Sequence, residues 1–350
     1  MTDTTRQQDM LSGAPAAGRA QASASPVALG LRLLNFGPLL ILAVLVVVFS
    51  VLTPNFLKPG NLSNILAQTA VIAIVAMGQQ LVILTRGIDL SVGANLALAT
   101  VMGGLIFRAT DGSGFMVIMA MLVAGTAVGL VNGVVFVFGR LPHPFIITLA
   151  TLSICRGLAL QLSINNTTMR GMPDAVLFLG ETSALGIPNS FYVVLGMALI
   201  VLVMTKSMVW GRWTYAVGGN PKAAVEMGIA VKWVLVSTYA FAGLCAGIGA
   251  VVLSGRTGAS SPLYGTLLEL DTIAAVIIGG ASFLGGRGHI GHALIGALMI
   301  GVIRNALNLL NVGVFYQMIA IGVIIVVAVE ADVLRSYLEG RARSQAARAQ

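Results

Sequence analysis

The feature that most constrains this chain is a series of ten apolar segments. Each is close to the roughly 20 residues that a helix needs to cross the hydrocarbon core of a bilayer. A helical segment satisfies its backbone hydrogen bonds internally, as crossing lipid requires. The sequence therefore predicts an all-α, polytopic integral membrane protein with about ten transmembrane helices. The expected spans are 36–53, 62–85, 91–108, 115–138, 143–163, 190–206, 233–254, 267–285, 289–308 and 314–331.

The composition supports a membrane chain and excludes an ordinary soluble domain. Hydrophobic residues make up 57% of the 350 positions and charged residues 9%, compared with roughly 25% charged in an average soluble domain. The 42 glycines suit transmembrane helices that pack backbone to backbone. Three regions follow: a disordered tail at residues 1–35, a transmembrane domain at 36–331 and a basic tail at 332–350.

The basic residues predict the orientation, because loops rich in Lys and Arg stay in the cytoplasm. With the N-terminus inside, four basic residues fall outside: Lys58, Arg108, Arg170 and Arg256. Two fall within spans: Arg156 and Arg304. The fourteen others are then cytoplasmic: Arg6, Arg19, Arg32, Arg86, Arg140, Lys206, Arg212, Lys222, Lys232, Arg287, Arg335, Arg341, Arg343 and Arg348. We therefore expect both termini in the cytoplasm, and topology rather than nucleic-acid binding explains the net charge of +8.

A constant shift of 172 residues places the second to fifth expected spans over the seventh to tenth. Because the shift moves the chain by five spans, the second copy must be inverted in the membrane. Few residues are identical under the shift: Gly93 with Gly265, Thr100 with Thr272, Gly114 with Gly286 and Gly129 with Gly301. The spacing predicts an inverted structural repeat, which is common in transporter folds.

Between the sixth and seventh spans, the sequence "GNPKAAVEMG" at 219–228 predicts a helix too short to cross a membrane. Asn220 is a typical N-cap, Pro221 suits the first helical position, and Gly228 suits a C-terminal stop. On the cytoplasmic side, such a helix can lie in a groove of a soluble partner and pass motion to the flanking spans. The alternative is a helix that rests on lipid headgroups.

The short helix supplies the candidate coupling residues. We expect Ala223, Ala224 and Met227 to form a small apolar contact surface beside a polar edge. The whole candidate set is Gly219, Asn220, Pro221, Lys222, Ala223, Glu226 and Gly228.

The sequence contains no evident internal energy source or catalytic centre. A P-loop needs Lys followed by Ser or Thr after glycine, and the only Lys followed by either is Lys206, in "VMTKS". The acidic residues, which could couple transport to an ion gradient, lie near the ends of expected spans. Cys155 and Cys245 lie in apolar runs and are expected to be small core residues, so no metal site is expected. We therefore expect a non-enzymatic chain without a cofactor, driven by another protein; a secondary carrier for a polar metabolite is the alternative.

Five ordered motifs resemble those of the permease subunit of ribose-type sugar ABC importers. They are "LTRGIDLSVGANLAL" at 84–98, "GLVNGVVFVFGRLPHPFIITLATL" at 129–152, "AVGGNPKAAVEMGI" at 216–229, "ELDTIAAVIIGGASFLGGRG" at 269–288 and "IGVIRNALNLLNV" at 300–312. Arg304 departs from the uncharged polar residue expected beside Asn305, which leaves the substrate class open.

The resemblance implies a ten-span subunit of the bacterial inner membrane, related in architecture to the cobalamin importer permease. It implies a second permease subunit, identical or not, and two ATPase subunits or one tandem ATPase, which would use the ATP. It further implies a periplasmic sugar-binding protein and import of a monosaccharide such as ribose or xylose. The 220–228 helix is similar to the coupling segment of that family.

Charged residues at span ends are further candidates. Arg86 and Asp89 either pair across a turn or form a second cytoplasmic contact with the ATPase. Glu269 and Asp271, at the expected outer start of the eighth span, either cap a helix or contact the binding protein. The other candidates for that outer contact are Arg170 and Arg256.

Small and polar residues inside the spans complete the set. Gly125, Gly129 and Gly133 recur every four residues and predict a close-packing face or a subunit seam. Polar residues in spans either hydrogen-bond between helices or line the solute pathway. Arg304 could instead neutralise an acidic group or pair with a partner subunit. The pathway candidates are Gln68, Asn132, Arg304, Asn305 and Asn308.

Overall fold

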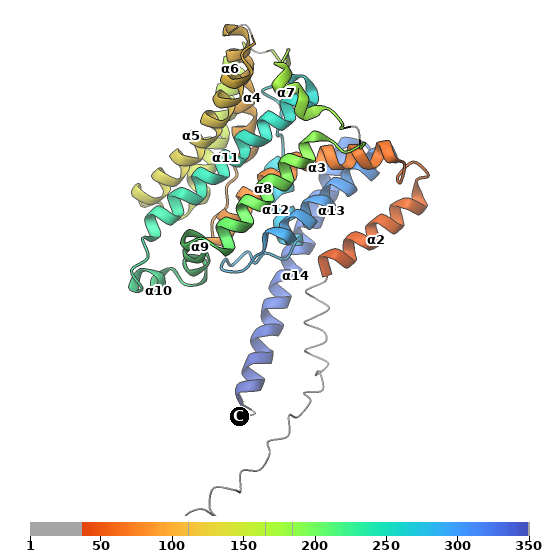
Figure 1. Ribbon diagram of the computed structural model, residues 1–350. Helices are drawn as coiled ribbons and strands as arrows, with labels where there is room; N and C mark the ends of the chain where they lie inside the picture. Colours follow the sequence, from red (N-terminus) through yellow and green to blue (C-terminus); the bar gives the residue numbers. More distant parts are fainter. Residues whose placement is uncertain (1–36, 111, 165, 184, 349–350) are drawn as a thin grey trace, which may run out of the picture. The chain divides into compact units, whose positions relative to one another are not determined.

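The computed structural model describes residues 37–110, 112–164, 166–183 and 185–348. Helices dominate this part of the chain, as Figure 1 shows. The all-α fold predicted from the sequence is therefore confirmed. The tail predicted at residues 1–35 lies outside the described residues.

Among the described residues, seven helices are long and apolar enough to cross a membrane. They are α3 (Pro59–Leu84), α4 (Val92–Ala109), α5 (Gly114–Phe138), α6 (Pro144–Leu162), α8 (Asn189–Lys206), α11 (Val231–Thr257) and α13 (Ile290–Leu309). Two shorter apolar helices match the first and tenth expected spans: α2 (Gly37–Leu52) and the first part of α14 (Val314–Arg348). The basic tail predicted at 332–350 continues α14 as far as Arg348.

The eighth expected span is longer than the helix that the structure contains there. Its helix, α12 (Leu268–Ile278), has 11 residues and is only about 16 Å long, roughly half the thickness of a bilayer core. The chain leaves α12 through Gly280, whose φ of +95° lies in the left-handed region that glycine tolerates best. A full span over 267–285 was therefore the wrong prediction, because glycines end the helix early.

Short elements mark the two ends of the bundle. At one end, strand β1 (Met169–Arg170) pairs antiparallel with β2 (Ala259–Ser260), near α7 (Asp174–Leu177) and the 3-10 helix η1 (Phe178–Gly180). At the other end lie α9 (Val209–Gly219) and α10 (Pro221–Glu226). Figure 1 shows α7 and α10 at opposite ends of the helices. We call these the β end and the α10 end.

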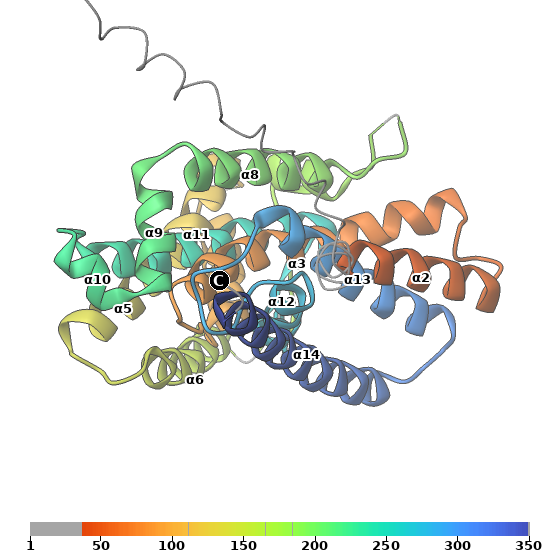
Figure 2. The same cartoon turned by 90° about the horizontal axis from the view of Figure 1, so that it is seen from below.

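The helix bounds and the packing both support the predicted repeat. Shifting α3 by 172 residues places its first residue at position 231, where α11 begins. The same contacts recur: α4 packs on α5 and α6 as α12 packs on α13 and α14, and α5 packs on α11 as α13 packs on α3. The two copies are inverted, because α3 ends at the α10 end, where α11 starts. Figure 2 shows α3, α11 and α12 in the centre of the bundle, with α6 and α14 outside them.

The predicted glycine face of α5 lies against α11 of the same chain. A Cβ atom on Gly125 would be 2.6 Å from the Gly243 carbonyl oxygen, and one on Gly133 would be 2.8 Å from the Val236 Cα. A Cβ on Gly129 would meet the Tyr239 carbonyl oxygen still more closely. The close-packing interpretation is confirmed, and the three glycines are used within the chain rather than at a subunit seam.

We expect Gly129→Leu to destabilise the protein, because its side chain would collide with the backbone of α11. Overpacking of this kind costs about 1–3 kcal/mol or more. The matched control is Gly196→Leu on α8, where no atom lies within 4 Å of an added Cβ. Thermal unfolding in detergent should show a lower melting temperature for Gly129→Leu only. Equal melting temperatures would contradict the packing described here.

Candidate functional site

The short helix at the α10 end has the caps that its sequence predicts. The Asn220 side-chain oxygen accepts hydrogen bonds from the backbone N–H groups of Lys222 and Ala223, at 3.1 and 3.2 Å. Pro221 is the first residue of α10. Gly228 follows with φ of +78°, which lets the chain turn back toward α11. The predicted short helix is confirmed, although its role is a separate question.

The exposed surface of α10 differs from the expected one. Ala224 is only 3% exposed, because it packs against Val217 of α9 and Val234 of α11. Val225 and Met227 are instead 61% and 82% exposed. Exposure of Met227 and partial exposure of Ala223 agree with the prediction, whereas Ala224 was wrongly included and Val225 was missed. A helix of 6 residues is too short for its own periodicity to reveal which face is buried.

Arg86 links the segment after α3 to the C-terminal end of α9 through hydrogen bonds. Its Nε donates a hydrogen bond to the Gly218 carbonyl oxygen at 2.6 Å, and its Nη2 donates to that of Gly219. These carbonyls end α9, where a positive charge is stabilised by the helix dipole. Arg86 thus joins the segment after α3 to the residues directly before α10. The expected pairing of Arg86 with Asp89 is not the arrangement found.

Asp89 is drawn into the bundle. Its carboxylate is only 1% exposed and accepts hydrogen bonds from the backbone N–H of Ser91 at 2.8 Å and from the Ser91 hydroxyl at 2.6 Å. Asn132 of α5 in turn donates to the Ser91 hydroxyl oxygen at 2.8 Å. Asp89 therefore lacks the exposed surface that a second partner contact would need. Asn132 is fully buried, which argues against its predicted place in the pathway.

Helix α4 begins inside the bundle rather than at its surface. Asn95, in its first turn, donates a hydrogen bond to the Gly125 carbonyl oxygen at 3.0 Å, and Gly125 lies about halfway along α5. The seven residues 85–91 therefore run from the α10 end into the middle of the helices.

The segment before α12 enters from the β end in the same way. Ser260 lies beside Gly104 of α4, and the Ser261 carbonyl accepts a hydrogen bond from Thr100 at 3.2 Å. Gly265 then lies against Gly93, about 16 Å further along α4. The start of α12 is thus deep in the bundle, which corrects the expected outer position.

Gly93 and Gly265 lie at the meeting point of the two entering segments. A Cβ atom on Gly265 would be 3.0 Å from the Gly93 carbonyl carbon. A Cβ on Gly93 would meet the Gly265 carbonyl oxygen and the Glu269 carboxylate. The two glycines are related by the 172-residue shift, so the local symmetry axis of the repeat passes between them. Helices that start inside the membrane are typical of substrate and ion sites in transporters.

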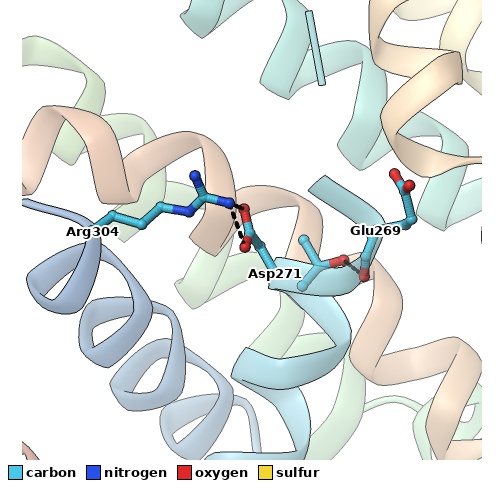
Figure 3. Close-up of polar contacts among 4 residues, drawn as sticks. Glu269, Asp271 and Arg304 are labelled. Atoms are coloured by element: carbon cyan, nitrogen blue, oxygen red, sulfur yellow. Dashed lines mark hydrogen bonds and ion pairs between the residues drawn. The ribbon is translucent and has the colours of Figure 1, made fainter. Parts of the chain in front are cut away.

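A charged pair joins α12 to α13 beside this point. The Arg304 Nη2 lies 2.8 Å from Asp271 Oδ1 and 2.7 Å from Oδ2, as Figure 3 shows. Asp271 is 4% exposed, so it does not offer the predicted outer contact. The expectation that Arg304 neutralises an acidic group is confirmed. The expectation that acids avoid the middle of the membrane is wrong, because α12 begins there.

Glu269 points away from that pair (Figure 3). Its backbone carbonyl accepts a hydrogen bond from the Thr272 hydroxyl at 3.0 Å, while its carboxylate extends toward α4. Arg156 of α6 lies on the same side and donates from Nη1 to the Tyr264 carbonyl oxygen at 2.9 Å. Arg156 was not among the site residues predicted from the sequence. The one signal that could have selected it is that Arg156 is a charged residue within an expected span.

The other pathway candidates form hydrogen bonds with polar side chains of the protein itself. Asn305 and Asn61 exchange two amide hydrogen bonds of 2.9 Å between α13 and α3. Asn308 accepts from Gln317 of α14 at 2.8 Å. Gln68 donates to Asn64 of its own helix at 3.0 Å. The interhelical interpretation therefore holds for Asn305 and Asn308.

The remaining outer candidates stay predictions. Arg170 lies on β1 and Arg256 in the last turn of α11, both exposed at the β end. Within the part of the chain that the structure describes, no group of three His, Cys, Asp or Glu residues is placed to hold a metal ion. Cys155 and Cys245 are buried, free thiols, as expected.

We expect Asp271→Asn to destabilise the bundle, because it leaves the Arg304 charge without its partner. Breaking a buried pair costs about 3–5 kcal/mol, and the 28% exposure of Arg304 favours the lower end. The double variant Asp271→Asn with Arg304→Gln should recover part of the loss. A double-mutant cycle of thermal unfolding measures this, and additive effects of the two substitutions would contradict the ion pair.

Comparison with known proteins identifies the family. A protein-family model described as "Branched-chain amino acid transport system / permease component" matches residues 61–329. The ribose import permease protein RbsC of Bacillus subtilis (strain 168) is 41% identical over 300 residues, which cover 85% of this chain and 92% of the relative. No solved structure matches the chain significantly.

Two further relatives act on other sugars according to their names. The D-allose transport system permease protein AlsC of Escherichia coli (strain K12) is 40% identical over 303 residues, covering 86% of this chain and 92% of the relative. The fructose import permease protein FrcC of Rhizobium meliloti is 36% identical over 304 residues, covering 84% of each chain. The resemblance based on the five motifs is thereby confirmed. The three relatives named above are sugar permeases. This chain therefore belongs to the family of transport-system permease components whose model matches residues 61–329.

Proposed function

We propose that this chain forms the translocation pathway of an ATP-driven importer for a monosaccharide and is moved by separate ATPase subunits through α10. The chain itself is not an enzyme and holds no cofactor; its partners bind and hydrolyse the ATP. The names of its relatives, which include ribose, allose and fructose permeases, support a sugar as the solute.

The observation that carries this proposal is the form of α10. Val225 and Met227 expose two large apolar side chains beside the charged Lys222 and Glu226, on a helix far too short to span lipid. An exposed apolar patch with a polar rim is typical of a protein contact. α10 is also capped at both ends, so it can transmit force as a unit.

A continuous set of contacts leads from α10 into the bundle. Gly218 and Gly219, directly before α10, hold Arg86 through their carbonyl oxygens. Arg86 belongs to the segment 85–91, which ends at the buried start of α4. A displacement of α10 by an ATPase therefore reaches the middle of the membrane through one short stretch of backbone. Such a shift between two arrangements is how ligand binding in one subunit opens or closes another.

The partners follow from the orientation. The basic residues of the α10 end, including Arg140, Arg212 and Lys222, support a cytoplasmic position for this end and for both termini in a bacterial cell. The β end then faces the periplasm, where Arg170 and Arg256 are available to a sugar-binding protein. A second permease chain, identical or related, completes the pathway in the inner membrane. Two ATPase subunits or one tandem ATPase bind the α10 ends.

We expect Gly228→Val to abolish ATP-driven solute uptake while leaving the protein in the membrane. Valine is strained at the φ of +78° that Gly228 adopts, so the end of α10 would be remodelled. Gly186→Val is the matched control, because Gly186 has φ of +75°, equally free space around it, and lies at the β end. Uptake by proteoliposomes containing the full complex measures both variants.

Two outcomes are informative. Loss of uptake in Gly228→Val with retained uptake in Gly186→Val supports the role of α10. Normal uptake in Gly228→Val would contradict that role, and uptake by the permease alone, driven by a proton or sodium gradient, would replace the whole proposal with a secondary carrier.

A further inference from the structure

Two opposite charges lie close to the symmetry axis without forming an ion pair. Glu269 and Arg156 are both half-buried, and among the described residues neither takes part in a salt bridge. Both lie beside the segment that leads into α12: Arg156 donates to the Tyr264 carbonyl oxygen, and the Glu269 carboxylate lies beside Gly93. Asp271, only two residues from Glu269, is by contrast neutralised by Arg304 at 2.7 Å. Glu269 and Arg156 therefore keep hydrogen-bonding capacity that no helix contact uses.

The depth of these groups determines what can cover them. The Glu269 carboxylate lies beside Gly93, in the first turn of α4, about halfway through the bundle. Charged side chains at the middle of a membrane face a bundle interior or a water-filled cavity, because exposure to lipid costs several kcal/mol. The face between α6 and the start of α12 is therefore covered by protein or by water rather than by lipid.

We propose that Arg156 and Glu269 form a solute-contacting site in the translocation pathway, at which a neutral polyhydroxylated solute passes. This inference rests on the proposed function and locates its pathway. The Glu269 carboxylate accepts hydrogen bonds from solute hydroxyl groups, and the Arg156 guanidinium donates to them. One positive and one negative group give the site no net preference for an ionic solute.

The geometry also suits release of the solute. Arg156 is held by hydrogen bonds from Nη1 to the carbonyl oxygens of Pro262 and Tyr264, on the segment that leads to α12. Only part of its donor capacity remains for the solute, and both side chains are half-buried rather than fully enclosed. Such a site offers several weak contacts instead of one strong contact. A solute can then enter the pathway and also leave it.

The proposed site lies at the inner end of segment 85–91, through which a movement of α10 would be transmitted. Gly93 touches both Gly265 and the Glu269 carboxylate, and it follows the segment 85–91 by two residues. A shift of that segment changes the space around Glu269 directly. The proposed site and the coupling contact of Arg86 thus lie at the two ends of one short segment.

Cysteine accessibility tests the position of Glu269. We would label Glu269→Cys in the purified permease–ATPase complex in nanodiscs with MTSET, a charged, membrane-impermeant methanethiosulfonate. The matched control is Leu195→Cys on α8, whose side chain is 50% exposed on the bundle surface. Because only a hydrated thiolate reacts, we expect Glu269→Cys to react at least about tenfold faster than this control. The wild-type complex gives the background, since both native cysteines are buried.

The conformational cycle sharpens this test. Labelling of Glu269→Cys should change between the nucleotide-free complex and the complex trapped with ATP and vanadate. Labelling no faster than that of Leu195→Cys in both states would overturn the site, while ATP-driven uptake by the wild-type complex would still support the proposed function. Absence of ATP-driven uptake by the wild-type complex would instead overturn the proposed function.

Uptake by two substitutions separates hydrogen bonding from proton coupling. Glu269→Gln keeps an acceptor oxygen, whereas Glu269→Ala removes it, so maximal uptake should fall about tenfold in Glu269→Ala and clearly less in Glu269→Gln. Size-exclusion profiles verify that both complexes assemble. Equal loss in the two variants would mean that the charge or the ionisation of Glu269, rather than an acceptor oxygen, is essential, which would overturn the hydrogen-bonding role.

Discussion

Inside a bilayer, backbone N–H and C=O groups need partners within the protein, and two irregular segments of this chain meet that requirement only because helices surround them. Residues 85–91 and 258–267 enter from opposite ends and meet where Gly93 lies against Gly265. Side chains would not fit between these backbones. The close approach of α5 and α11 through facing glycines encloses the same region. The depth at which α4 and α12 begin follows from this enclosure.

This arrangement gives a permease two mechanical properties at once. The starts of α4 and α12 are near the symmetry axis, where a small shift changes the space available to a solute. The segment 85–91 also reaches the surface at the α10 end, where Arg86 donates hydrogen bonds to the last carbonyl oxygens of α9. In the function proposed above, coupling between a separate ATPase and the pathway would require neither a long lever nor the movement of every helix. The Arg304–Asp271 pair fixes α12 to α13 on the opposite side.

Sequence reasoning predicted what depends on local chemistry and missed what depends on tertiary placement. The apolar runs gave the spans, the caps around Asn220 gave α10, and the 172-residue spacing gave the repeat. The depth of Glu269 and Asp271 was missed, because a helix that starts inside a membrane looks in sequence like one that starts at its surface. Arg86 and Ala224 were assigned the wrong neighbours for a related reason: their contacts, Gly218, Val217 and Val234, are set by how α9 and α11 fold around them.

The most direct test of this account is the coupling ratio of an Arg86→Ala complex in proteoliposomes. The measured quantity is the amount of solute imported for each ATP hydrolysed when the binding protein is present. If Arg86 transmits the movement of α10 to the start of α4, the variant should still hydrolyse ATP but import several-fold less solute for each ATP. An unchanged ratio in a fully assembled complex would show that the movement reaches the pathway by another route.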